Sequence, residues 1–126
     1  MTNQNEKNSS ASAPVLVEST PERVADDLAR IGRRVLVLYG TELPAAVRER
    51  LNNYEGGFLL FEMSGAEPKP LEESVGVGAM ICRHELIDAL LVVGGETALG
   101  FAAKIEERFR SQNPAGRGAG IVRIAL

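Results

Sequence analysis

Two kinds of apolar pattern alternate along the chain. Short continuous runs predict buried strands, and longer stretches with apolar residues every three or four positions predict helices. The predicted strands cover residues 15–17, 34–39, 58–61, 88–93 and 121–125. The predicted helices cover 19–31, 43–54, 71–85 and 97–110, with Gly76 and Gly78 as weak points of the third.

The central strands are apolar at every position, as in residues 35–38 and 90–93. Such strands are buried on both faces, which is typical of a parallel sheet covered by helices. Because strands and helices alternate, right-handed crossovers should join the strands. The pattern therefore predicts an α/β domain with three layers, a doubly wound parallel sheet between two layers of helices.

Residues 1–13 differ from the rest of the chain. They contain no large apolar residue except Met1, so they cannot bury enough surface to offset the entropy of ordering. We expect a disordered tail over 1–13 and a single domain over 14–126, a usual length for one domain.

Composition excludes several classes of partner. The net charge of −3 and the scattered basic residues argue against nucleic-acid binding. No apolar stretch approaches the roughly 20 residues of a membrane helix, and the polar amino terminus does not resemble a signal peptide. We therefore expect a cytoplasmic protein that binds neither nucleic acid nor membrane.

The strand at 88–93 ends in Gly94 and Gly95, and a helix-forming sequence follows at once. A strand that turns sharply into a helix presents backbone N–H groups and the positive end of the helix dipole, which favours phosphate. In an open parallel sheet, ligands bind beyond the carboxyl ends of the strands, here residues 40–42, 62–70 and 94–97. A tight turn also favours glycine without any ligand, so a purely structural role stays open.

A longer series of segments supports a more specific interpretation. In chain order they are the strand at 34–40, the loop Gly65-Ala66-Glu67-Pro68-Lys69-Pro70, Val75 and Gly78, the strand and turn at 88–95, and Ala102-Ala103-Lys104. Over about residues 15–126, their order resembles the N-terminal domain of the iron-containing alcohol dehydrogenases, in the dehydroquinate synthase-like superfamily. That family has a Glu-Pro-x-Pro loop and an Asp-x-Ile-x-x-Val-Gly-Gly-Gly-Ser turn. The resemblance implies a Rossmann-like nucleotide-binding domain.

The resemblance also implies a cofactor site. Gly94, Gly95, Glu96 and Thr97 would lie against the pyrophosphate of NAD or NADP. Gly40 would stand where relatives that prefer NAD often carry an acid for the ribose 2′-hydroxyl, and Thr41 or Arg34 would help to hold a 2′-phosphate. The choice between NAD and NADP stays open.

Three positions depart from the family pattern. Glu96 replaces the third glycine, and a carboxylate about 5 Å from a diphosphate costs about 3 kcal/mol per charge pair at an effective dielectric near 20. An acid in the first turn stabilises the helix by about 0.3–1 kcal/mol. Gly100 stands where the family has an Asp, and Lys104 is displaced by one residue. We therefore expect weak cofactor binding.

Metal ligands are scarce. In the family, one Asp and three His of a separate domain hold the metal, whereas His84 is the one histidine and Cys82 the one cysteine here. We expect His84 to be a surface or packing residue and no metal in this chain. The resemblance then implies a domain that is inactive alone and depends on a separate chain with the metal domain. A homo-oligomer stays open as another partner.

Other interpretations remain open. One alternative is a non-catalytic interaction or regulatory domain with a decayed phosphate site, and another is an ATP site like the Gly-Gly-Asp-Gly-Thr turns of sugar and lipid kinases. Glu67 is expected to belong to a rigid turn rather than to contact a ligand. Glu72-Glu73 and Glu106-Glu107-Arg108 are expected on solvated helix faces, and Cys82 in plain packing.

Overall fold

A five-stranded parallel sheet forms the centre of the computed structural model, which describes residues 15–65, 72–113 and 118–125. The strands lie in the order β1-β5-β4-β2-β3, and every neighbouring pair is parallel. Their bounds are β1 Leu16–Ser19, β2 Arg34–Tyr39, β3 Leu59–Met63, β4 Ala89–Val93 and β5 Gly120–Ile124. β1 therefore lies at one edge of the sheet and β3 at the other.

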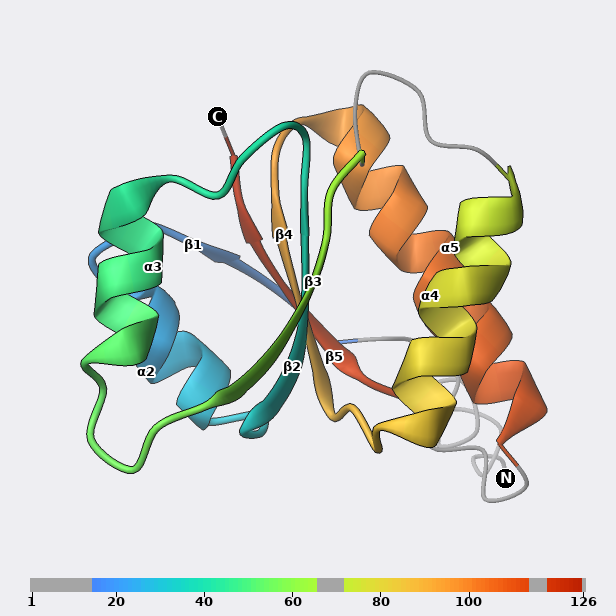
Figure 1. Cartoon of the computed structure of the whole chain (residues 1–126), viewed down its shortest axis with the longest axis horizontal. Helices are drawn as coiled ribbons and strands as arrows, with labels where there is room; N and C mark the ends of the chain where they lie inside the picture. Colours follow the sequence, from blue (N-terminus) through green and yellow to red (C-terminus); the bar gives the residue numbers. More distant parts are fainter. Residues whose placement is uncertain (1–14, 66–71, 114–117, 126) are drawn as a thin grey trace, which may run out of the picture.

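Helices cover both faces of the sheet (Figure 1). One face carries α2 (Val24–Ala29) and α3 (Ala45–Asn52), and the other carries α4 (Glu72–His84) and α5 (Glu96–Gln112). The chain runs from β1 through β2 to β3 in one direction across the sheet, and from β3 through β4 to β5 in the other. Right-handed crossovers then place the two pairs of helices on opposite faces. The three-layer, doubly wound fold is confirmed.

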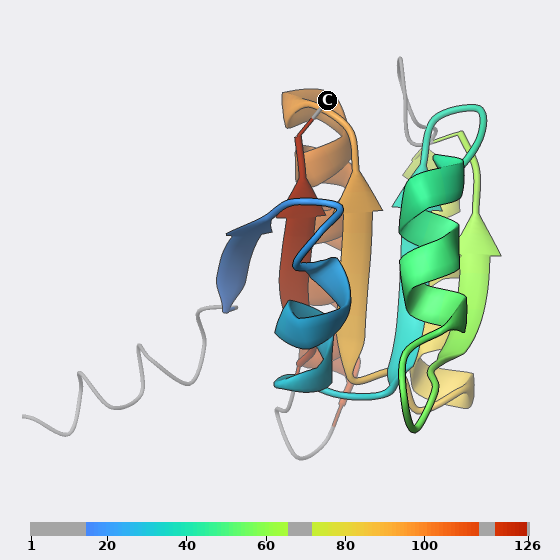
Figure 2. The same ribbon diagram turned by 90° about the vertical axis from the view of Figure 1, so that its left-hand side faces the viewer.

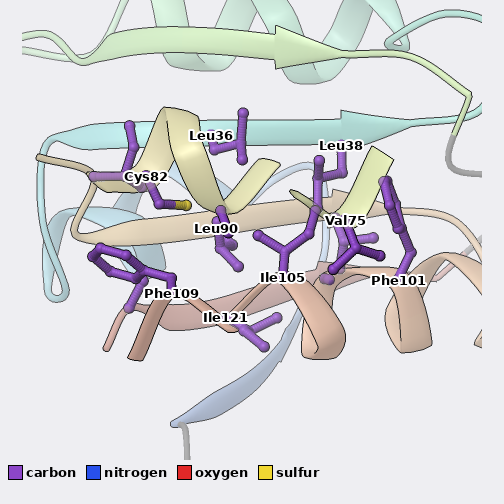
Figure 3. Packing of buried hydrophobic residues seen from close by; sticks show 14 of the residues in the cluster. Leu36, Leu38, Val75, Cys82, Leu90, Phe101, Ile105, Phe109 and Ile121 are labelled. Carbon is purple, nitrogen blue, oxygen red and sulfur yellow. The ribbon is translucent and has the colours of Figure 1, made fainter. Parts of the chain in front are cut away.

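Alternate residues of the central strands build two separate cores. Leu36, Leu38 and Leu90 pack with α4 and α5, and Figure 3 shows them beside Ile105 and Phe109. Val35, Val37 and Leu91 point the other way. They pack with Leu28 of α2 and Val47 of α3. All five residues of β4 are buried, which explains the uninterrupted apolar run in its sequence.

Element boundaries differ from the predicted ones by a few residues. The first helix was expected from about Ser19, but α2 begins at Val24. The residues before it form a separate turn, in which the Arg23 amide donates a hydrogen bond to the Thr20 carbonyl at 3.1 Å. The third strand starts at Leu59 rather than Phe58 and reaches Met63, after Gly56 and Gly57 turn the chain with φ values of 87° and 70°.

Some predictions lie outside the described residues. These are the tail over 1–13 and the part of the proline-containing loop that includes Glu67.

The expectation that Glu106 is solvated is wrong. Glu106 is 1% exposed, because it shares the buried face of α5 with Ala102 and Phe109. Its carboxylate accepts hydrogen bonds from Arg110, one turn later, at 3.0 and 3.1 Å. A side chain at Gly118 would overlap this carboxylate, so glycine there leaves room for it. Glu107 is exposed, as predicted.

Two helical glycines allow a prediction about packing. A Cβ at Gly78 would lie 2.5 Å from Ile105 Cδ1, so Gly78 sets the close approach of α4 to α5, whereas a Cβ at Gly100 meets nothing within 4 Å. We expect Gly100→Ala to stabilise the fold by about 0.5–1 kcal/mol, because alanine favours the helix. Gly78→Ala should destabilise it by about 1 kcal/mol, because overpacking exceeds that gain.

Urea unfolding of the two single variants measures this difference. If Gly78→Ala stabilised the chain as much as Gly100→Ala, the close helix contact would not depend on that glycine.

Candidate functional site

The direction of the connections reverses between β2 and β4, which are neighbours in the sheet. The chain leaves β2 towards α3 on one face and leaves β4 towards α5 on the other, from the same end of the sheet (Figure 2). Tyr39 pairs with Val93 at this end, so Gly40 and Gly94 follow directly on neighbouring strands. In open α/β sheets, ligands bind at such a reversal, beyond the carboxyl ends of the strands. We refer to this region, between residues 40–41 and 94–97, as the crevice.

The amino end of α5 lies at this crevice. Gly95 is the N-cap residue, and no side chain caps the helix. The first backbone bond into the helix runs from the Leu99 amide to the Gly95 carbonyl at 3.0 Å, so the amides of Glu96 and Thr97 precede it. Both residues are exposed. Amides in this position and the helix dipole together favour an anion.

Gly94 has a different role from its neighbours. It is buried, and its amide donates to the Ile124 carbonyl of β5 at 3.0 Å. This bond fixes the turn against the sheet and uses the Gly94 amide. The backbone donors that face solvent at this end are therefore expected among the first residues of α5.

Gly40 and Thr41 form the other side of the crevice. Gly40 is half-buried, and its carbonyl accepts the Gly65 amide at 2.7 Å, which ties the loops after β2 and β3 together. Thr41 is exposed. The structure thus brings together the two ends that the sequence predicted, residues 40–41 and 94–97.

The predicted contribution of Arg34 is wrong. Arg34 is the first residue of β2, and its Nε donates to the Glu85 carbonyl at 2.6 Å at the amino end of the sheet. Gly40 lies six positions further along the chain, about 20 Å away at 3.3 Å per residue of strand. Its side chain therefore lies at the amino end of the strands, whereas the crevice lies at their carboxyl ends.

A polar cluster beside Gly40 was not predicted. The Tyr39 hydroxyl donates to Glu62 Oε1 at 3.1 Å, and Arg48 of α3 donates to both oxygens of Glu62 at 2.7 and 2.9 Å. Burial and the adjacent carboxylate raise the pKa of Tyr39, while the guanidinium lowers the pKa of Glu62. The charges of Arg48 and Glu62 are therefore paired with each other, next to the end of β2 at Gly40.

Arg123 of β5 was also missed. Its Nε and Nη2 donate to the two carboxylate oxygens of Glu18, both at 2.9 Å, and its Nη1 lies 3.2 Å from Glu96 Oε2. The Arg123 side chain is 13% exposed, whereas that of Glu96 is 84% exposed. Glu96 at the start of α5 is therefore an exposed carboxylate with a cationic partner. The pairing of Glu18 with Arg123 across β1 and β5 would have been the signal, but it needs the strand order.

This ion pair makes one pH dependence predictable. Hydrogen bonds from Arg123 lower the pKa of Glu18 below its usual value of 4.5. Since the folded-state pKa lies below the unfolded one, the pair stabilises the fold above the unfolded value and stops doing so as the pH falls through the lowered pKa. We expect Arg123→Gln to raise the pKa of Glu18 towards 4.5, as measured by NMR titration of its carboxyl carbon. An unchanged pKa would show that the pair does not persist in solution.

Other candidate residues show no sign of a reactive site. Cys82 is buried, and burial, with a smaller contribution from Glu106, raises the pKa of its thiol to about 12, which fits the predicted packing role. His84 and Gly100 are exposed. Within residues 15–65, 72–113 and 118–125, no three His, Cys, Asp or Glu side chains gather as metal ligands. None of the described helices has the length and apolarity to cross a membrane.

Comparison with known proteins identifies sequence relatives. The chain is 36% identical over 84 residues to a probable NADH-dependent butanol dehydrogenase 1 of Bacillus subtilis, a match that covers 62% of this chain and 21% of the relative. It is 30% identical over 80 residues to NADH-dependent butanol dehydrogenase A of Clostridium acetobutylicum, with 60% and 21% covered. The chain thus spans about a fifth of the length of these relatives. No family model matches.

Solved structures share the fold. The crystal structure of NADH-dependent butanol dehydrogenase A of Thermotoga maritima superposes with a TM-score of 0.62 at 21% identity, covering 89% of this chain and 32% of that one. An archaeal halo-thermophilic alcohol dehydrogenase from a Red Sea brine pool gives 0.66 at 17% identity, with 80% and 27% covered. These relatives confirm the resemblance to the iron-containing alcohol dehydrogenase family that the sequence indicated.

Proposed function

We propose that this chain, a relative of the iron-containing alcohol dehydrogenases, binds a nicotinamide dinucleotide across the crevice between β2 and β4. The observation that carries the proposal is the uncapped amino end of α5, exposed at the switch point of the sheet. The two butanol dehydrogenases that resemble this chain are named as NADH-dependent. Their names support a nicotinamide dinucleotide over other ligands that contain phosphate.

In this proposal the diphosphate lies on the amides of Glu96 and Thr97. The Gly94 amide does not take part, since β5 already uses it. The adenosine ribose lies beside Gly40 and Thr41, where the absence of a side chain at Gly40 leaves room for the sugar. NADH is the first candidate, because Gly40 offers no cation for a 2′-phosphate.

The bound cofactor would supply the redox chemistry, and this chain would hold and orient it. The residues of the chain fit the dinucleotide but do not fit iron, since the described part gathers no ligand set and the sequence contains a single histidine. We therefore propose that alcohol oxidation or aldehyde reduction requires residues beyond these 126. Metal-dependent oxidation of simple alcohols by this chain alone would contradict that part of the proposal.

Titration with NADH and NADPH, followed by the fluorescence of the cofactor, tests binding directly, and the absence of tryptophan keeps the background low. We expect an NADH dissociation constant below about 100 μM, equivalent to more than about 5.5 kcal/mol. ADP should compete, because it carries the same diphosphate. No binding of NADH up to millimolar concentration would contradict the proposal and favour a non-catalytic interaction domain.

A further inference from the structure

Arg123 fixes the side on which the Glu96 carboxylate lies. The order β5-β4-β2 places β5 on one side of β4 and the crevice on the other. Glu96 begins the helix that follows β4, and its carboxylate meets Arg123 of β5 at 3.2 Å. The ion pair therefore directs this carboxylate towards β5, away from the crevice between β4 and β2.

The Arg123 guanidinium is itself held in place. Glu18 of β1 accepts two parallel hydrogen bonds from it, a geometry that orients a guanidinium strongly. With Glu18 engaged through Nε and Nη2, Nη1 is the atom that meets Glu96. The three residues carry a net charge of −1, and loss of the guanidinium would leave two carboxylates beside the amino end of α5.

We propose that Arg123 is a positioning residue for dinucleotide binding, because it pairs with Glu96 and keeps that carboxylate away from the diphosphate. The inference rests on the proposed function and gives it a mechanism: an acid at the first residue of α5 becomes compatible with an anionic ligand. Arg123 itself does not touch the ligand. It acts through Glu96.

A double-mutant cycle tests the proposal. Arg123→Gln should weaken NADH binding about tenfold at low salt, since an unpaired carboxylate then faces the diphosphate. In a Glu96→Gln background the same substitution should weaken binding no more than about threefold. The difference between these two effects is the coupling that the proposal requires.

Controls separate positioning from folding. Arg108→Gln removes an equal charge from α5, where Arg108 pairs with Glu72, and should leave the NADH dissociation constant within about twofold. The tenfold effect of Arg123→Gln should shrink at 0.5 M salt, which loss of folding would not cause. Urea midpoints measured for all variants identify any that is partly unfolded.

The outcomes of this cycle are distinct. If the unsubstituted chain and Glu96→Gln both fail to bind NADH and ADP, the proposed function and this inference fail together. If the unsubstituted chain binds NADH but Arg123→Gln has the same effect with and without Glu96, the proposed function stands and the role of Arg123 is overturned.

Discussion

Arg110→Ala is expected to lower the free energy of unfolding by about 3 kcal/mol. The Glu106 carboxylate is 1% exposed, and three hydrogen bonds from Arg110 satisfy it. Truncation of Arg110 leaves a buried carboxylate without its cation, which is among the most destabilising single changes. The Arg110 side chain itself is 21% exposed, so the loss of its own packing adds to this effect.

Urea denaturation followed by circular dichroism gives this free energy. Arg108→Ala is the matched control, because Arg108 lies on the same helix and its pair with Glu72 is exposed on both sides, so we expect less than about 1 kcal/mol. If both variants lost the same free energy of unfolding, the buried ion pair of Glu106 would contribute no more to stability than an exposed one.

Thr97→Asp should weaken NADH binding about thirtyfold while leaving the fold intact. Thr97 is the second residue of α5, and a charge about 6 Å from the diphosphate costs about 2 kcal/mol at an effective dielectric near 25. An acid in the first helical turn also stabilises the helix by about 0.3–1 kcal/mol. Binding and stability should therefore change in opposite directions.

Thr97→Asn is the control for Thr97→Asp, since it has nearly the same shape without the charge. We expect the dissociation constant of Thr97→Asn to stay within about threefold of the original. If the aspartate variant bound NADH as well as the asparagine variant, the diphosphate would not lie at the amino end of α5.

The fold was largely predictable because burial on both faces leaves a strong signal in sequence. Residues 35–38 and 89–93 are apolar throughout and form the buried parts of the central strands β2 and β4. Where the local sequence signal was weaker, the predicted element boundaries were less accurate. Residues 21–23 have the composition of a first helical turn, but in the structure they precede α2 as a separate turn.

The two ends of the candidate site were also predictable, since glycine after a buried strand marks the connection to a helix. The charges around the site were not. Glu106 looks like part of a solvated charge run, and its burial depends on the helix face and on Gly118, twelve residues later. Arg123 meets Glu18 across 105 residues of sequence, so its role required the strand order.

Pairing with Arg123 also changes the significance of Glu96. Considered alone, an acid in the phosphate turn indicates a decayed site. With its carboxylate 84% exposed and bonded towards β5, Glu96 is compatible with a ligand on the opposite side of β4.

The central claim is that a dinucleotide binds between the ends of β2 and β4. Titration of the ¹⁵N-labelled chain with NADH, followed by amide chemical shifts, tests it most directly. The account predicts the largest saturable shifts at Glu96 and Thr97, with further shifts at Gly40 and Thr41. Shifts confined to other surfaces, or none at these four amides up to millimolar NADH, would contradict it.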